Sequence, residues 1–243
     1  MKTKFWIFSA LAISLFLTTG CFSDDDGFFN CERGEGDAVT ESFSIDDFEG
    51  IELDIAADVY ITQGDNFSIE VQGQQNILNE LELEVKGDIL DIDFDDCVRN
   101  YDDLMFWISM PELDFVRICG SGRIFSENFI TANDIVLEIS GSGDIDLGLS
   151  ADDIETKISG SGKILLEGTA NDLDAVISGS GDVRAFDLIS EKVDCRISGS
   201  GDMEVHATDK LDVKITGSGD VYYKGNPEVN VDITGSGDVV NAN

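Results

Sequence analysis

Apolar and polar residues alternate along most of this chain. Ile135, Leu137 and Ile139 are separated by mostly polar residues, the polar turn "SGSGD" follows, and Ile145 and Leu147 resume the alternation. Successive side chains of a strand point to opposite faces, so this pattern predicts short strands with one buried and one wet face. The same alternation over most of the chain predicts an all-β fold.

The turn sequence "ISGSGD" recurs with small changes at intervals of 18–21 residues. Self-similarity at a fixed short period predicts a solenoid. We expect a single-stranded parallel β-helix (β-solenoid) with two strands and two corners in each coil. Its two facing sheets would meet at the GSG corners, where glycine can adopt positive φ without a Cβ clash. The first glycines of the seven corners are Gly120, Gly141, Gly160, Gly179, Gly199, Gly217 and Gly235.

The alternation divides the chain into segments. Residues 41–117 alternate without GSG corners, and we expect irregular coils of the same solenoid there, with a single helical turn at "NILNEL". Residues 118–243 would form the regular coils, so 41–243 would be one solenoid domain. The last strand is followed by little that could cover it, and we expect that end of the stack to be open.

The first forty residues have a different character. Lys2 and Lys4 precede the apolar run "FWIFSALAISLFL", and "LTTGC" ends at Cys21. This resembles the signal peptide (1–20) and lipobox of a bacterial lipoprotein, which implies that Cys21 is lipidated; an ordinary secretory signal is the alternative. Residues 21–40 would then be an acidic tether.

Acidic residues follow the predicted lipid anchor directly. The run Ser23, Asp24, Asp25 and Asp26 resembles the export signal that sends Bacteroidetes lipoproteins to the outer face of the outer membrane. We therefore expect a lipid-anchored outer-membrane protein that faces the cell exterior. The alternative is a solvated tether that keeps the domain off the membrane.

The charge balance excludes some partners. The chain has 15 Lys plus Arg against 50 Asp plus Glu, a formal net charge of −35. Nucleic acid is excluded as a partner because phosphate binding depends on Lys and Arg. The positions after the last four GSG turns are Asp182, Asp202, Asp220 and Asp238. Such a ladder could hold Ca²⁺, which prefers carboxylate oxygens, or each Asp could simply cap its turn. No other cofactor is expected.

The predicted geometry limits which of the remaining cysteines can form a disulfide. Cys119 and Cys195 precede corners four coils apart, about 19 Å along the axis, which is too far for a disulfide. Cys31 and Cys97 both lie in the irregular part and form the plausible disulfide pair. Cys195 is expected to be a small core residue. The single histidine, His206, makes a His-based metal site improbable.

The GSG repeats, the segment "DFEGIELDIAADVYITQGD" and the lipoprotein leader together resemble the head GIN domain family of autotransporter adhesins. The resemblance covers residues 41–243. It implies a β-helix, right-handed and similar in shape to pectin lyases but without their catalytic residues. It also implies a role in cell adhesion.

The sequence favours three classes of function to different degrees. Arg184, Arg196 and Lys214 are too scattered to suggest a catalytic base, so a polysaccharide-processing enzyme is the least favoured class. A solenoid face suits an extended ligand, which predicts an adhesin-like module that binds a glycan or a cell-surface protein. A purely structural periplasmic envelope protein is the alternative, and a homo-oligomer is compatible with either class. Side chains that could stack on sugars are Tyr60, Phe186 and Tyr222.

Overall fold

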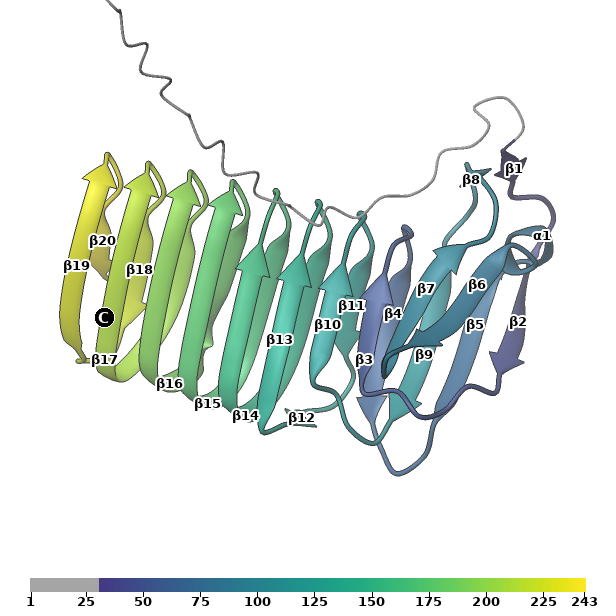
Figure 1. Ribbon diagram of the computed structural model, residues 1–243, viewed down its shortest axis with the longest axis horizontal. Helices are drawn as coiled ribbons and strands as arrows, with labels where there is room; N and C mark the ends of the chain where they lie inside the picture. The colour runs from purple at the N-terminus through teal and green to yellow at the C-terminus, as the bar shows by residue number, and fades with distance from the viewer. Residues whose placement is uncertain (1–30) are drawn as a thin grey trace, which may run out of the picture.

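The computed structural model describes residues 31–243, which form a β-solenoid of stacked coils that runs from purple to yellow in Figure 1. Twenty strands and one helical turn make up this part of the chain. The N-terminal elements are β1 Glu32–Arg33, β2 Ala38–Phe43, β3 Gly50–Leu53, β4 Asp58–Gln63, β5 Ser68–Gln74, α1 Gln75–Leu78, β6 Leu81–Lys86, β7 Ile89–Phe94, β8 Val98–Arg99 and β9 Met105–Met110. The later strands are β10 Phe115–Ile118, β11 Arg123–Ser126, β12 Ile130–Thr131, β13 Asp134–Ile139, β14 Asp144–Ile158, β15 Lys163–Gly179, β16 Asp182–Gly199, β17 Met203–Gly217, β18 Val221–Lys224, β19 Glu228–Gly235 and β20 Val239–Asn241.

Each regular coil contributes one strand segment to each of two facing sheets. Sheet 1 contains the segments that lead into the GSG corners: β3, β10, β13, the second halves of β14 to β17, and β19. Sheet 2 contains the segments that leave those corners: β4, β11, the first halves of β14 to β17, β18 and β20. All of these pairings are parallel, which confirms the predicted parallel solenoid.

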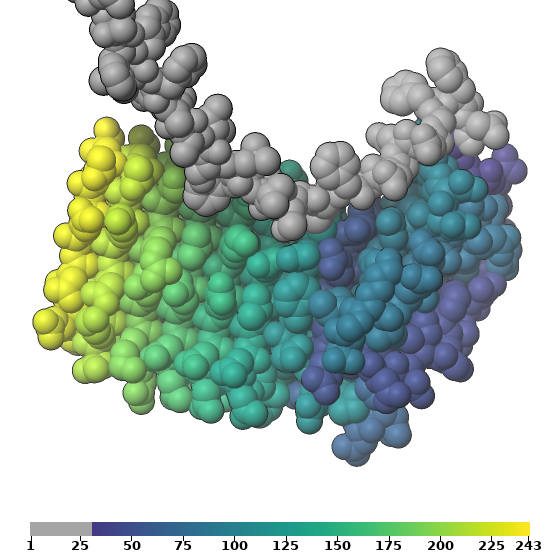
Figure 2. Space-filling model, in the orientation of Figure 1, coloured from purple at the N-terminus to yellow at the C-terminus, as the bar shows by residue number. Residues whose placement is uncertain are grey.

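The core lies between the two sheets and is built from columns of equivalent residues. Ile139, Ile158, Ile177 and Ile197 are in register in successive coils, and each exposes at most 3% of its surface. Cys195 is fully buried and free, as its place on the inward face predicted. Figure 2 shows the coils packed side by side as one continuous body.

Close stacking explains the glycines at the corners. A Cβ on Gly160 would lie 2.2 Å from the carbonyl oxygen of Gly141, one coil earlier, and a Cβ on Gly162 would lie 2.4 Å from that of Gly143. Both glycines of the corner therefore leave room for the corner beneath. Positive φ, the reason expected from sequence, applies to four of the seven first glycines: Gly179, Gly199, Gly217 and Gly235.

The order of coils along the axis differs from their order along the chain. β3 pairs in parallel with β10 on one side and with β7 on the other, and β4 pairs likewise with β11 and β9. The coil of residues 50–63 is therefore inserted between a coil of residues 89–110 and a coil of residues 115–126. After residue 63 the chain forms the N-terminal end of the stack. It then returns to the opposite side of the coil of residues 50–63, where β10 begins at Phe115.

The expectation of parallel coils throughout is wrong at the N-terminal end. β6 pairs antiparallel with β7, and β5 pairs antiparallel with both β9 and β2. These antiparallel strands and α1 cover the end of the stack, and the outermost strands there, β2 and β6, each pair with one neighbour. Their inward side chains belong to the same core as the coils, and α1 confirms the single helical turn predicted there.

The C-terminal end has no such cover within the described residues. β19 pairs only with β17, and β20 pairs only with β18. Val231 and Ile233 of β19 expose 48% and 38% of their surface, whereas Val213 and Ile215, one coil earlier, expose 4% and 0%. The predicted open end is thus present, and inward-facing apolar side chains reach solvent there.

Candidate functional site

Three aromatic side chains stand side by side on the outer face of sheet 2. β9, β4 and β11 are neighbours, and their register aligns Trp107, Tyr60 and Phe125 in one row. The Tyr60 ring centroid lies 5.8 Å from that of Trp107 and 5.4 Å from that of Phe125, with interplanar angles of 14° and 20°. All three rings are partly exposed. We call this row the aromatic stripe.

Hydrogen-bonding side chains flank the stripe on both long sides. Towards the GSG corners, the Arg123 guanidinium donates to both carboxylate oxygens of Asp58 and lies 5.6 Å from the Phe125 ring centroid. The hydrogen bonds to Asp58 raise the pKa of Arg123. On the other side, the Thr62 hydroxyl donates to Glu127 over 2.8 Å. The two hydrogen bonds to Asp58 hold the Arg123 side chain in place beside the rings.

Carboxylates occupy the two ends of the row. Glu70 of β5 is in register with Trp107, and Asp146 of β14 is in register with Phe125. The surface therefore offers an apolar aromatic strip with acceptors and donors around it. Aromatic faces and edges contact apolar C–H groups, and the surrounding groups can bind hydroxyls. The acidic rim disfavours anionic ligands.

The other aromatic residues named from sequence lie outside this stripe. The Tyr222 hydroxyl donates to Asp220 over 3.3 Å, and the Lys224 ammonium lies 4.3 Å from the Phe186 ring centroid. Sequence reasoning named Tyr60 but missed Trp107 and Phe125. The outward position of Trp107 in the alternating stretch "FWISM" was the available signal, but its neighbour in space depends on the inserted coil.

The Asp ladder of sheet 2 binds backbone amides. The side-chain carboxylate of Asp182 accepts the amide of Asp202, that of Asp202 accepts the amide of Asp220, and that of Asp220 accepts the amide of Asp238, at 3.3, 2.8 and 2.8 Å. The carboxylates therefore act as turn caps, which was the alternative to calcium binding. Each one caps the turn of the next coil. The charge of Asp220, followed by burial, raises the pKa of Tyr222. Calcium binding by the four carboxylates stays a prediction.

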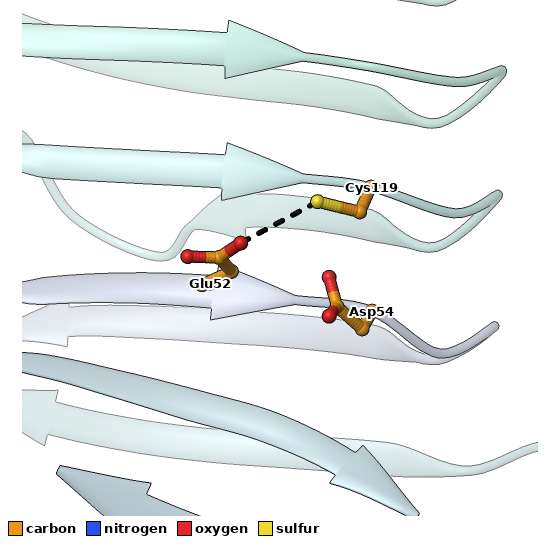
Figure 3. A group of neighbouring side chains, drawn as sticks. All are labelled: Glu52, Asp54 and Cys119. Atoms are coloured by element: carbon orange, nitrogen blue, oxygen red, sulfur yellow. Dashed lines mark hydrogen bonds between the residues drawn. The ribbon is translucent and has the colours of Figure 1, made fainter. Parts of the chain in front are cut away.

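Within residues 31–243, the four aspartates do not form a cluster of possible metal ligands, but Glu52, Asp54 and Cys119 do (Figure 3). Their ligand atoms lie within 4.8 Å of one another. Cys119 Sγ lies 3.5 Å from Glu52 Oε1. Cys119 also has a further partner. Two carboxylates fall short of the six or more oxygens that Ca²⁺ takes, so we assign no metal to this group.

The Asp54 carboxyl group of this cluster is half-buried. Burial, followed by the charges of Glu52, Asp93 and Asp91, raises its pKa to about 6, against the opposing effect of Arg117. One of its carboxylate oxygens is buried without a hydrogen bond. The position is therefore costly for an ionised carboxylate.

The structure joins Cys31 and Cys97 in a disulfide with an S–S distance of 2.01 Å and a Cα–Cα distance of 4.6 Å. It ties β1 to β8, which form a separate two-stranded parallel pair at the closed end. Cys21, Ser23, Asp24, Asp25 and Asp26 lie outside the described residues. Within the described part, no helix is both long and apolar enough to span a membrane.

Two of the three basic residues considered for catalysis are neighbours: Arg196 and Lys214 are in register on adjacent strands of sheet 1, whereas Arg184 lies on sheet 2. Arg184 of sheet 2 lies 3.8 Å from Asp182, whereas Arg196 of sheet 1 pairs with Asp174 and Asp194 at 3.0 Å each. These arginines lie on different sheets and are engaged in surface ion pairs. No catalytic grouping among them follows from the geometry.

Parallel coils with glycine corners and a covered N-terminal end define the chain as a β-solenoid. Residues 47–227 match the family described as "Putative auto-transporter adhesin, head GIN domain", and the chain belongs to that family. The resemblance inferred from the sequence is thereby confirmed. No curated protein matches the chain.

Solved structures share the fold. A "putative adhesin" from Bacteroides fragilis has 26% identity and a TM-score of 0.82, covering 86% of this chain and 99% of that one. A "putative adhesin" from Parabacteroides distasonis has 29% identity and a TM-score of 0.73, covering 87% and 99%. A "putative lipid binding protein" from the same species has 26% identity and a TM-score of 0.73, covering 87% and 100%.

Proposed function

We propose that this protein is a non-catalytic, adhesin-like binding module and that the aromatic stripe is its ligand surface. The observation that carries the proposal is the row of three partly exposed, stacked rings on the outer face of sheet 2. Membership of an adhesin family supports the same function. The ligand is a neutral glycan.

The chemistry of the stripe favours this ligand class. A pyranose ring combines an apolar C–H face with hydroxyls around its edge, which complements aromatic rings flanked by hydrogen-bonding groups. Arg123 and Asp58 present a fixed donor and acceptor pair on one side, and Thr62 and Glu127 present another. Acidic glycans would be repelled by the carboxylates around the stripe and by the net charge of −35.

A glycan array with the purified full-length chain tests the proposal. We expect binding to neutral glycans, and we expect Trp107→Leu and Phe125→Leu to weaken it about 10-fold each, as the loss of about 1.5 kcal/mol of aromatic contact implies. Phe129→Leu is the matched control, because Phe129 is 57% exposed and lies outside the stripe. Its affinity should stay within about 2-fold of wild type.

Three outcomes would overturn this assignment. One is the absence of any bound neutral glycan, and another is an equal loss in the Phe129 control. The third is binding to phosphatidylcholine vesicles without glycan binding, which would favour a function like that named for the lipid-binding neighbour. Thermal unfolding of each variant shows whether a lost affinity reflects a lost fold.

The location is part of the same proposal: Cys21 carries a lipid anchor, and Ser23 to Asp26 direct the chain to the outer face of the outer membrane. Proteinase K treatment of intact cells should digest the wild type but spare an Asp24/Asp25/Asp26→Ala variant. Digestion of both would refute the role of the acidic run. Protection of both would place the chain in the periplasm, where a structural envelope role would replace adhesion.

A further inference from the structure

The C-terminal coil presents an end face of apolar side chains whose equivalents in the preceding coil are buried. Val231 and Ile233 continue the inward columns that contain Val213 and Ile215, yet they expose 48% and 38% of their surface. Within the described residues, the outer edges of β19 and β20 pair with no strand. An edge of this kind, with exposed apolar side chains beside it, is a template for strand addition.

The opposite end of the molecule does not fit this edge. There the outermost strands are β2 and β6, which pair antiparallel with β5 and β7 and have unpaired outer edges within the described residues, so this end does not repeat the form of the C-terminal coil. Head-to-tail stacking of copies would therefore join two unlike ends, and it would continue into an open polymer. A second copy can meet the edge with its own C-terminal coil, and two like ends related by a two-fold axis form a closed dimer.

Two-fold symmetry makes the joined copies of β19 antiparallel, and charge selects their register. Pairing centred on Asn230 would place Glu228 opposite Asp232, and pairing centred on Asp232 would place that residue opposite itself. Like charges directly opposite are destabilising. Pairing centred on Val231 avoids both conflicts.

The register centred on Val231 also pairs compatible side chains. It places Asn230 opposite Asp232, whose amide and carboxylate can hydrogen-bond. It places Val229 opposite Ile233, which keeps apolar side chains on the inward face of both copies. Opposite residues then share a face, as antiparallel pairing requires.

We propose that two copies of this chain associate tail to tail, with β19 of one copy paired antiparallel to β19 of the other about Val231. The apolar end face of each copy covers that of the other, and the two sheets continue across the junction. The proposal rests on the C-terminal coil alone and is independent of the glycan assignment.

Site-directed crosslinking tests both the partner and the register. In the proposed register Glu228 lies opposite Thr234 of the second copy, and both side chains are exposed. Opposite Cα atoms about 5 Å apart allow a disulfide. Two copies of the same residue would lie about 20 Å apart, six residues along the strand. A mixture of purified full-length Glu228→Cys and Thr234→Cys chains should therefore form a disulfide-linked dimer on mild oxidation.

Three controls decide the result. Each variant alone, and the parent chain without an added cysteine, should give less than about one-tenth of the crosslink found in the mixture. Equal crosslinking in the single-variant samples, or none in the mixture, would overturn the proposal. Light scattering of the wild type should give the mass of a dimer in a concentration-dependent equilibrium with monomer. A monomer at all concentrations, or a growing polymer, would also overturn it.

Discussion

Replacement of Gly199 by alanine should break the stack at one defined place. A Cβ on Gly199 would lie 2.1 Å from the carbonyl oxygen of Gly179 in the coil beneath, and φ at Gly199 is +150°. That φ costs about 1–3 kcal/mol for a residue with a side chain. Lifting the corner also breaks the 2.9 Å hydrogen bond from the Ser200 amide to the same carbonyl, worth about 1 kcal/mol. We expect a total loss of about 3–5 kcal/mol, including the local repacking.

Hydrogen exchange measured by mass spectrometry can locate this loss. In a solenoid each coil contacts only its neighbours, so coils beyond residue 199 should lose protection while the N-terminal coils keep it. Ser200→Ala is the control, because Ser200 is exposed and keeps its backbone amide. Gly235→Ala places a Cβ 2.0 Å from the Gly217 carbonyl oxygen in the last coil, so it should release that coil only. A Gly199→Ala protein within about 1 kcal/mol of wild type would refute the close-stacking explanation.

Two further changes have predictable consequences. The pKa of Asp54 in the fold, about 6, exceeds its ordinary value of 3.8, so its stabilising contribution is complete at low pH and is lost as the pH rises through 6. At pH 7.5, Asp54→Asn should therefore have a free energy of unfolding roughly 1.5 kcal/mol above that of the wild type, which is half of the full linkage because the group is half-buried. At pH 4 the two proteins should differ little. A difference in urea unfolding that does not change with pH would contradict this expectation. Cys31→Ser/Cys97→Ser opens a loop with a sequence separation of 66 and should lower the free energy of unfolding by up to about 4 kcal/mol. Equal urea midpoints for the wild type and the variant under oxidising conditions would refute this expectation.

The regular coils could be predicted because their cause is repeated in the sequence. Each corner must leave room for the carbonyl groups of the corner beneath, so the glycines recur once per coil. The corner of residues 54–57 has no glycine, and its neighbour on the N-terminal side is the longer loop of residues 95–104 between β7 and β9, which does not form a matching corner. On the other side of this corner, Gly120 leaves room for the Asp54 carbonyl, at 3.0 Å from an added Cβ. The absence of glycine hid a regular coil within the segment that was expected to be irregular.

The candidate site could be predicted only in part, for a related reason. Alternation places Tyr60, Trp107 and Phe125 on outward faces, but it does not say which strands are neighbours. Their row exists because the coil of residues 50–63 lies between two coils that follow it in sequence. Nothing in a local pattern specifies that order, which is set by how the closed end packs.

The inserted coil also dictates when the fold can form during synthesis. Regular coils pair residues 18–21 positions apart, so each can close as soon as its own residues have left the ribosome. β3, in contrast, pairs Gly50 with Phe115, and β4 pairs Asp58 with Arg123, 65 positions away in each case. Such non-local pairing delays folding because a long loop must close first. The nascent chain must reach residue 126 before the inserted coil has both neighbours, and every later coil then grows from that finished template.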